Sequence, residues 1–169
     1  MNRSIAKYAV LSALAVSSLA AGWAVQAQAP VVGAADADAL FHSSDPHLDA
    51  NMQAAYHIEK DLLVAGHWEL ADRYLTSRYI QHNPNAASGR DNVVKFFTQV
   101  LHVKPKPIED RLTIPVVSVV ANGDLVVVVT PRVYKDPKDP SKTYTTTWFD
   151  MWRFKDGKAD EHWDCATRM

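Results

Sequence analysis

RLTIPVVSVVANGDLVVVVTPRVY, residues 111–134, is the stretch that decides the fold of this 169-residue chain. It contains two runs rich in β-branched residues, which lie on either side of Asn122-Gly123. β-Branched residues favour strands, and an Asn-Gly pair favours the tight turn of a hairpin. The stretch therefore predicts two antiparallel strands, 111–121 and 124–134.

Upstream of about residue 110, the hydrophobic residues recur at helical spacing instead. Ser44 or Asp45 can cap a first helix, Pro46 fits its first turn, and Gly66 can end it. The segment 76–89 lacks a sustained period and is expected to be a loop. Helices are thus predicted over residues 45–65, 67–75 and 90–102.

A second hairpin is predicted near the end of the chain. The runs TYTTTWFDMWRF, 143–154, and ADEHWDCAT, 159–167, flank the turn dipeptide Asp156-Gly157. Helices followed by antiparallel strands indicate an α+β fold. We expect three N-terminal helices packed on one curved antiparallel β-sheet of about four strands.

The N-terminus has the pattern of an export signal. Arg3 and Lys7 precede an uncharged apolar run, 8–25, and Val25-Gln26-Ala27 has the small-x-small form of a cleavage site. The alternative is an uncleaved membrane anchor, because the run is marginally long enough to span a bilayer. We expect a cleaved signal peptide at 1–27, a flexible leader at 28–44 and a domain at 45–169.

Export implies a periplasmic or secreted protein without stable membrane association after cleavage. The only cysteine is Cys165, so an intramolecular disulfide is excluded. The net charge of −1 and the lack of a Lys/Arg cluster argue against a nucleic-acid partner. The sequence contains no phosphate loop, dinucleotide fingerprint, nucleophile elbow or zinc motif.

The register of the last hairpin decides which side chains share a face. A two-residue turn places Asp150 opposite Trp163, whereas a three-residue turn with a bulge at Gly157 places it opposite His162. The second register is our interpretation, because it separates polar from apolar residues. One face then holds Trp148, Asp150, Trp152, Asp160, His162 and Asp164, and the other holds Phe149, Met151, Ala159, Trp163 and Cys165.

Large rings beside carboxylates on one face predict a partly apolar cavity with a few polar groups. The apolar face with Phe149, Met151 and Trp163 is expected to make the protein a homodimer through its sheet. Arg153 and Glu161 are expected to form an ion pair.

Three stretches resemble the SnoaL-like branch of the NTF2-like superfamily. They are YIQHNPNAASG (79–89), ANGDLVVV (121–128) and FDMWRFKDGKADEHWD (149–164), and the resemblance spans roughly residues 46–164. It implies a cone-shaped α+β domain. The same cone-shaped fold hosts cyclases, isomerases, dehydratases, binding proteins and assembly modules, so it does not fix the chemistry.

The resemblance also implies a site. Asp164 matches the position of the acid/base carboxylate in polyketide cyclases of the family, and Asp150 and Val128 stand where relatives carry a histidine. The expected catalytic residues are therefore Asp164, His162 and Asp150. The expected substrate-binding residues are Gln81, His82, Asn83, Tyr79, Trp148 and Trp152.

The first functional hypothesis is a cofactor-independent acid/base enzyme, an isomerase, cyclase or aldol-type lyase acting on a small apolar carbonyl compound. The second is a non-catalytic small-molecule-binding domain, and the third is an interaction module that pairs through its sheet. Asp150, His162, Asp164 and His82 are also acceptable metal ligands, but they lack a tight spacing motif, so neither metal nor cofactor is expected.

Overall fold

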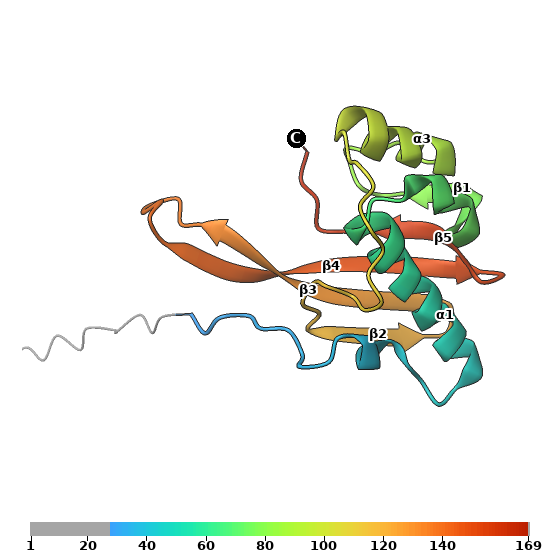
Figure 1. Ribbon diagram of the computed structural model, residues 1–169, viewed down its shortest axis with the longest axis horizontal. Coiled ribbons are helices and arrows are strands. Elements are labelled where there is room, and N and C mark those ends of the chain that lie inside the picture. The colour runs from blue at the N-terminus through green and yellow to red at the C-terminus, as the bar shows by residue number, and fades with distance from the viewer. Residues whose placement is uncertain (1–27, 169) are drawn as a thin grey trace, which may run out of the picture.

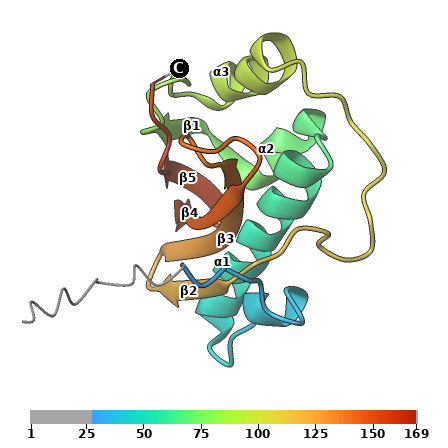
Figure 2. The same cartoon turned by 90° about the vertical axis from the view of Figure 1, so that its left-hand side faces the viewer.

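The computed structural model describes residues 28–168, in which the helices lie on one side of a curved five-stranded sheet (Figures 1 and 2). The predicted α+β fold, with three helical segments on the sheet, is confirmed. The predicted signal peptide at 1–27 lies outside the described residues. Within residues 28–168, no helix is long and apolar enough to cross a membrane.

The first helix begins where the sequence predicts. The side chain of Asp45 accepts hydrogen bonds from the backbone N–H groups of His47 (2.8 Å) and Leu48 (3.2 Å). Gly66, with φ of +78°, ends the segment. The helical elements are η1 (Asp38–Phe41), α1 (Pro46–His57), η2 (Ile58–Val64), η3 (Trp68–Leu70), α2 (Ala71–Tyr74), α3 (Arg90–Lys95) and η4 (Phe96–Val100).

The sheet has the strand order β1-β5-β4-β3-β2. Neighbouring strands are antiparallel except β1, which runs parallel to β5 at the edge. The prediction of a loop over 76–89 was wrong for its first part, because residues 76–81 belong to β1. The strands are β1 (Leu75–Gln81), β2 (Ser118–Asn122), β3 (Leu125–Lys135), β4 (Thr143–Lys155) and β5 (Lys158–Trp163).

The predicted register of the last hairpin was wrong in detail. Asp156 and Gly157 both have positive φ, 49° and 75°, and form a two-residue turn in which Lys155 pairs with Lys158. Asp160 is the extra residue of a bulge further along β5, and beyond it Trp152 pairs with His162. This register differs by two residues from the predicted one. Because side chains alternate between the faces with a period of two, the residues beyond the bulge lie on the faces that were predicted for them.

The bulge does change the position of Asp160. Its side chain does not join the face of Asp150 and His162, as expected. It accepts a hydrogen bond from Thr76 Oγ1 (2.7 Å) and forms an ion pair with Arg78, so it ties β5 to β1.

The segment 28–44 also differs from the expected flexible leader. Phe41 is fully buried in the core, the Ala34 N–H donates to Val116 O (2.7 Å), and Arg111 forms ion pairs with Asp36 and Asp38. An aromatic ring within the segment supplies enough apolar surface to hold it against the domain. Residues 34–44 are therefore part of the packed domain.

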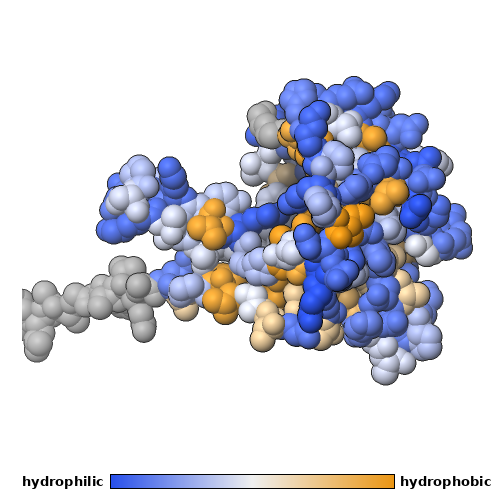
Figure 3. All heavy atoms as spheres, in the orientation of Figure 1, coloured by the Kyte–Doolittle hydropathy of each residue, from blue (hydrophilic) through white to orange (hydrophobic). Residues whose placement is uncertain are grey.

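Both faces of the sheet carry apolar side chains. Val126, Val128 and Trp152 point inward and are buried against the helices. Their strand neighbours Val127 and Phe149 point to the opposite, outer face, where Phe149 is 43% exposed. On the helical side, polar side chains cover most of the surface and hydrophobic ones appear in small groups (Figure 3).

Candidate functional site

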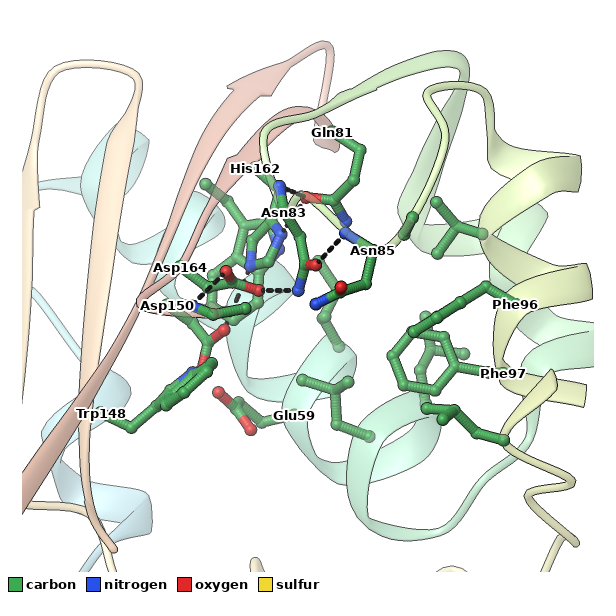
Figure 4. A pocket seen from close by; sticks show the side chains of 18 of the residues that line it. Glu59, Gln81, Asn83, Asn85, Phe96, Phe97, Trp148, Asp150, His162 and Asp164 are labelled. Carbon is green, nitrogen blue, oxygen red and sulfur yellow. Dashed lines mark hydrogen bonds and ion pairs between the residues drawn. The ribbon is translucent and has the colours of Figure 1, made fainter. Parts of the chain in front are cut away.

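A cavity of about 1000 Å³ lies between the helices and the inner face of the sheet. Its helical wall is mainly apolar, and the rings of Trp68 and Phe97 stack there at 3.8 Å between centroids. Its sheet wall carries polar side chains from β1, β4, β5 and the segments that follow β1 and β5 (Figure 4). This combination is typical of a small-molecule site. Apolar residues of the helical wall include Leu62, Leu63, Val93, Phe96 and Leu101.

Three predicted catalytic residues converge on the sheet wall. One carboxylate oxygen from each of Asp150 and Asp164 and one ring nitrogen of His162 all lie within 4.8 Å of one another. Asp150 and His162 are buried, each with 7% of its surface exposed, whereas Asp164 is partly exposed. The structure therefore brings together the cluster that the sequence predicts, from β4, β5 and the residue directly after β5.

The protonation of His162 follows from its neighbours. Gln81 Oε1 accepts the backbone N–H of Asn83 (3.0 Å), which fixes it as the oxygen of the amide. His162 Nδ1 lies 2.8 Å from the same oxygen and must therefore carry a proton and donate. His162 Nε2 lies 3.1 Å from Asp150 Oδ1, and two lone pairs would repel at that distance. One proton is thus shared between His162 Nε2 and Asp150.

Asp164 is held from two sides. Asn83 Nδ2 donates to its Oδ2 (2.6 Å), and the Ala166 backbone N–H donates to its Oδ1 (2.9 Å). The Asn85 backbone N–H in turn donates to Asn83 Oδ1 (2.9 Å) and orients that amide. The loop after β1 therefore fixes the direction of the Asp164 carboxylate.

Aromatic rings surround the histidine. Trp152 Nε1–H donates to the Tyr79 hydroxyl (3.1 Å), and both rings stack on His162, with centroids 5.2 Å and 6.2 Å away. Burial raises the pKa of Tyr79 far above its ordinary value, so its hydroxyl stays protonated. Trp148 also lines the cavity, and the Arg132 guanidinium carbon lies 5.2 Å from the centroid of its ring.

His82 was wrongly predicted as a ligand-binding residue. Its Nε2 lies 2.8 Å from Glu161 Oε1, and its ring stacks on Trp163 at 4.9 Å, on the outer face of the sheet. Successive residues of an extended chain point to opposite faces, so Gln81 and His82 cannot both face the cavity. Arg153 and Glu161 form the expected ion pair on this outer face (3.2 Å).

The sequence reasoning missed Glu59, which lies on η2 and lines the cavity. It is 3% exposed, and burial and the nearby charge of Asp150 raise the pKa of Glu59 to about 8, against the attraction of Arg132. Its spacing from Ala55 and Leu62, both buried, places an acid on the apolar face of the helix. An acidic residue at a position where the helical period calls for an apolar one was the sequence signal that could have identified Glu59.

A divalent cation would find its ligands in the same cluster. Asp150, His162 and Asp164 offer two carboxylates and one imidazole, a donor set that suits several divalent metals. Gln81 would then orient the histidine from behind, as acceptors of the second ring nitrogen do in metal sites. His82 is excluded as a fourth ligand by its place on the outer face.

The family model of the SnoaL-like domain matches residues 54–162, more than half of the chain. The chain belongs to this family. The SnoaL-like match includes Glu59, Gln81, Asp150 and His162, and it ends two residues before Asp164.

Solved structures share the fold of this SnoaL-like domain. A candidate SnoaL-like polyketide cyclase from Jannaschia sp. is 18% identical, with a TM-score of 0.51 over 73% of this chain and 91% of its own. A candidate polyketide cyclase from Acidithiobacillus ferrooxidans is 14% identical, with a TM-score of 0.50 over 68% of this chain and 86% of its own. At these identities the likeness shows the NTF2-like fold alone. No curated protein matches the chain.

Proposed function

We propose that the SnoaL-like domain binds a small, mainly apolar carbonyl compound and moves a proton at the carbon next to the carbonyl group. The observation that carries this proposal is the convergence of Asp150, His162 and Asp164 on one wall of an otherwise largely apolar cavity. The two structural relatives are both candidate polyketide cyclases, and cyclase chemistry is compatible with this step.

The three side chains have distinct roles in this proposal. The carboxylate of Asp164, oriented by Asn83, accepts the proton from the substrate carbon. The C–H electrons form a C=C bond, the carbonyl oxygen becomes an enolate oxygen, and protonated Asp164 returns the proton to the same or a neighbouring carbon. The proton shared by His162 and Asp150 keeps that pair neutral overall, so the cluster carries one negative charge.

The charge of the cluster limits the ligand. An anionic group placed against Asp164 would meet an uncompensated carboxylate in a cavity of low dielectric. A neutral ketone or aldehyde has no such penalty, and its apolar part matches the wall formed by Phe96, Phe97 and Leu62. This favours uncharged carbonyl compounds as the substrate class.

The test is deuterium exchange from heavy water into acetophenone and cyclohexanone, followed by proton NMR. We expect exchange above the buffer rate, and a loss of about a hundredfold or more in Asp164→Asn, since acid/base groups contribute on that order. Asp156→Asn is the matched control, because Asp156 is an exposed turn residue outside the cavity. Exchange should persist after dialysis against EDTA if no metal takes part.

Two results would contradict the catalytic proposal. Absence of exchange above buffer with both ketones would remove it, and binding without exchange would identify the domain as a binding protein. Retention of exchange in Asp164→Asn, with an unchanged melting temperature, would remove Asp164 from the mechanism.

A further inference from the structure

Three polar atoms of cavity-lining residues have no hydrogen-bond partner among residues 28–168. One is Trp68 Nε1, in the helical wall beside Phe97, and the other two are the oxygens Glu59 Oε1 and Thr130 Oγ1. Glu59 and Thr130 are 3% and 4% exposed, and both residues line the cavity. A buried polar atom without a partner costs about 1–3 kcal/mol, so native structures contain few of them.

The two residues approach the cavity from different layers. Glu59 comes from η2 in the helical layer, and its carboxyl group lies beside Trp148 and Asp150 in the cavity (Figure 4). Thr130 comes from β3 and pairs in register with Trp148 of β4, one inward-facing position from Asp150. The helical layer and the sheet therefore each place one such oxygen on the Trp148 side of the Asp150–His162–Asp164 cluster. Neither oxygen has a hydrogen-bond partner within the described chain.

Two of the predicted substrate-binding residues are engaged elsewhere. Asn83 Nδ2 donates to Asp164, and His82 lies on the outer face of the sheet. An enolate needs hydrogen-bond donors at its oxygen, since charge develops there as the proton leaves carbon. Among the groups that line the cavity near the cluster, Glu59 and Thr130 have buried oxygens without a partner in residues 28–168 and can supply such donors.

The protonation state of Glu59 suits this role. Because burial and the charge of Asp150 raise its pKa to about 8, Glu59 is mainly the neutral acid near pH 7 and presents an O–H donor. The Thr130 hydroxyl can also donate. Neither group adds negative charge where the enolate oxygen would form.

We propose that Glu59 and Thr130 form an oxyanion subsite, which binds the carbonyl oxygen of the substrate while its acidic carbon faces Asp164. This inference rests on the proposed function for the catalytic step, but the subsite itself is a binding site for any neutral hydroxyl or carbonyl oxygen on an apolar ring. The substrate is then a compound with one uncharged oxygen at its buried end.

The test compares para-fluorophenol with para-fluorotoluene, a pair of nearly equal shape that differs in one hydroxyl group, by ligand-observed fluorine NMR. The wild-type protein should bind the phenol about tenfold or more tightly than the toluene. Glu59→Leu and Thr130→Val should each remove most of that preference and leave the affinity for the toluene within about twofold. Asp156→Asn is the matched control and should keep the preference.

The outcomes separate this inference from the proposed function. A wild-type protein without preference for the phenol, or variants that keep the preference, would overturn the subsite. Phenol preference that depends on Glu59 and Thr130, without ketone exchange, would support the subsite and contradict catalysis. Exchange that is unchanged in both Glu59→Leu and Thr130→Val would support catalysis and overturn the subsite. Melting curves of both variants show whether either one fails to fold. If one does, the ligand preference of the other variant tests the subsite.

Discussion

His162 Nε2 lies 3.1 Å from Asp150 Oδ1, while His162 Nδ1 lies 2.8 Å from Gln81 Oε1. The imidazole therefore bridges β1 and β4 through its two ring nitrogens. Since the Gln81 oxygen fixes a proton on Nδ1, the state of Nε2 depends on Asp150 alone.

Asp150→Asn should change the protonation of His162 without removing the ring from its place. The side-chain amide introduced by this substitution can donate to Nε2, so we expect neutral His162 with its proton on Nδ1 and a lone pair on Nε2. Nitrogen NMR of labelled histidine should show Nε2 moving to the unprotonated range, while Nδ1 stays protonated. Asp124→Asn, on the outer face, should leave both signals unchanged. A wild-type Nδ1 without a proton would refute the assignment.

Glu59→Gln should make stability less dependent on pH. The folded-state pKa of Glu59, about 8, lies above the ordinary value of 4.5, so its favourable contribution is complete below about pH 4.5 and is lost as pH rises toward 8. Relative to Glu59→Gln, the wild type should lose up to about 1.4 kcal/mol in free energy of unfolding per pH unit in that window.

Urea unfolding at several pH values measures the effect of Glu59. Glu109→Gln is the matched control, because Glu109 is exposed and is not among the residues that line the cavity. A wild type and a Glu59→Gln variant with parallel stability profiles between about pH 5 and 8 would show that Glu59 ionises normally in the folded protein.

Asp160→Asn should weaken the junction of β1 and β5. The guanidinium of Arg78, followed by the Thr76 hydroxyl, lowers the pKa of Asp160, so this carboxylate stabilises the fold above about pH 3.8 and stops doing so as pH falls through its folded-state value. We expect a loss of about 1–3 kcal/mol at neutral pH, visible as a lower melting temperature by several degrees. Asp124→Asn, whose carboxylate is half-exposed, should cost less than about 1 kcal/mol. Equal losses in the two variants would contradict this role.

Phe149→Glu should turn a homodimer into a monomer. The outer face of the sheet carries Val127, Val129 and Met151 beside Phe149, so a dimer through this face would bury a continuous apolar patch. Light scattering at micromolar concentration checks the mass of the wild type and the variant. Val100→Glu, on the exposed side of η4, is the control for a new charge. A monomeric wild type would refute the dimer.

The isolated mature protein should begin at Gln28 if the predicted cleavage after Ala27 occurs. Intact-mass analysis of periplasmic or secreted material measures this directly, and the leader up to Gly33 should remain on the protein. Recovery of the chain with Met1 in a membrane fraction would instead support the anchor alternative.

Local signals made most of the fold predictable. Asp45 caps α1, Gly123 lies in the turn between β2 and β3, and Asp156-Gly157 turns between β4 and β5, as residue type alone indicates. The strand β1 was not predictable in this way. Its partner β5 lies about eighty residues later, and its sequence LTSRYIQ has neither β-branched enrichment nor strict alternation.

The part of the candidate site that lies on the strands was predictable, because alternation along a strand decides which side chains face the cavity. Trp148, Asp150, Trp152, His162 and Asp164 all line the cavity, because the true register and the predicted one differ by two residues and keep the same faces. The position of Glu59 depends on how the helix packs over the sheet, and the place of His82 depends on the unpredicted strand β1. Local spacing puts Glu59 on the apolar face of its helix, but it does not give the place of either residue relative to the cluster.

The pairing of β1 with β5 also sets the order in which the chain can fold. The pocket wall at Gln81 and Asn83 is held by His162 and Asp164, which follow about eighty residues later in the chain. A growing chain can form its helices and the β2–β3 hairpin early, because those contacts are local, but it must close a loop of about eighty residues before the edge strand has a partner. The cavity is thus completed only after β5 has been synthesised, and a nascent chain that stops before Lys158 would have its edge strand unpaired.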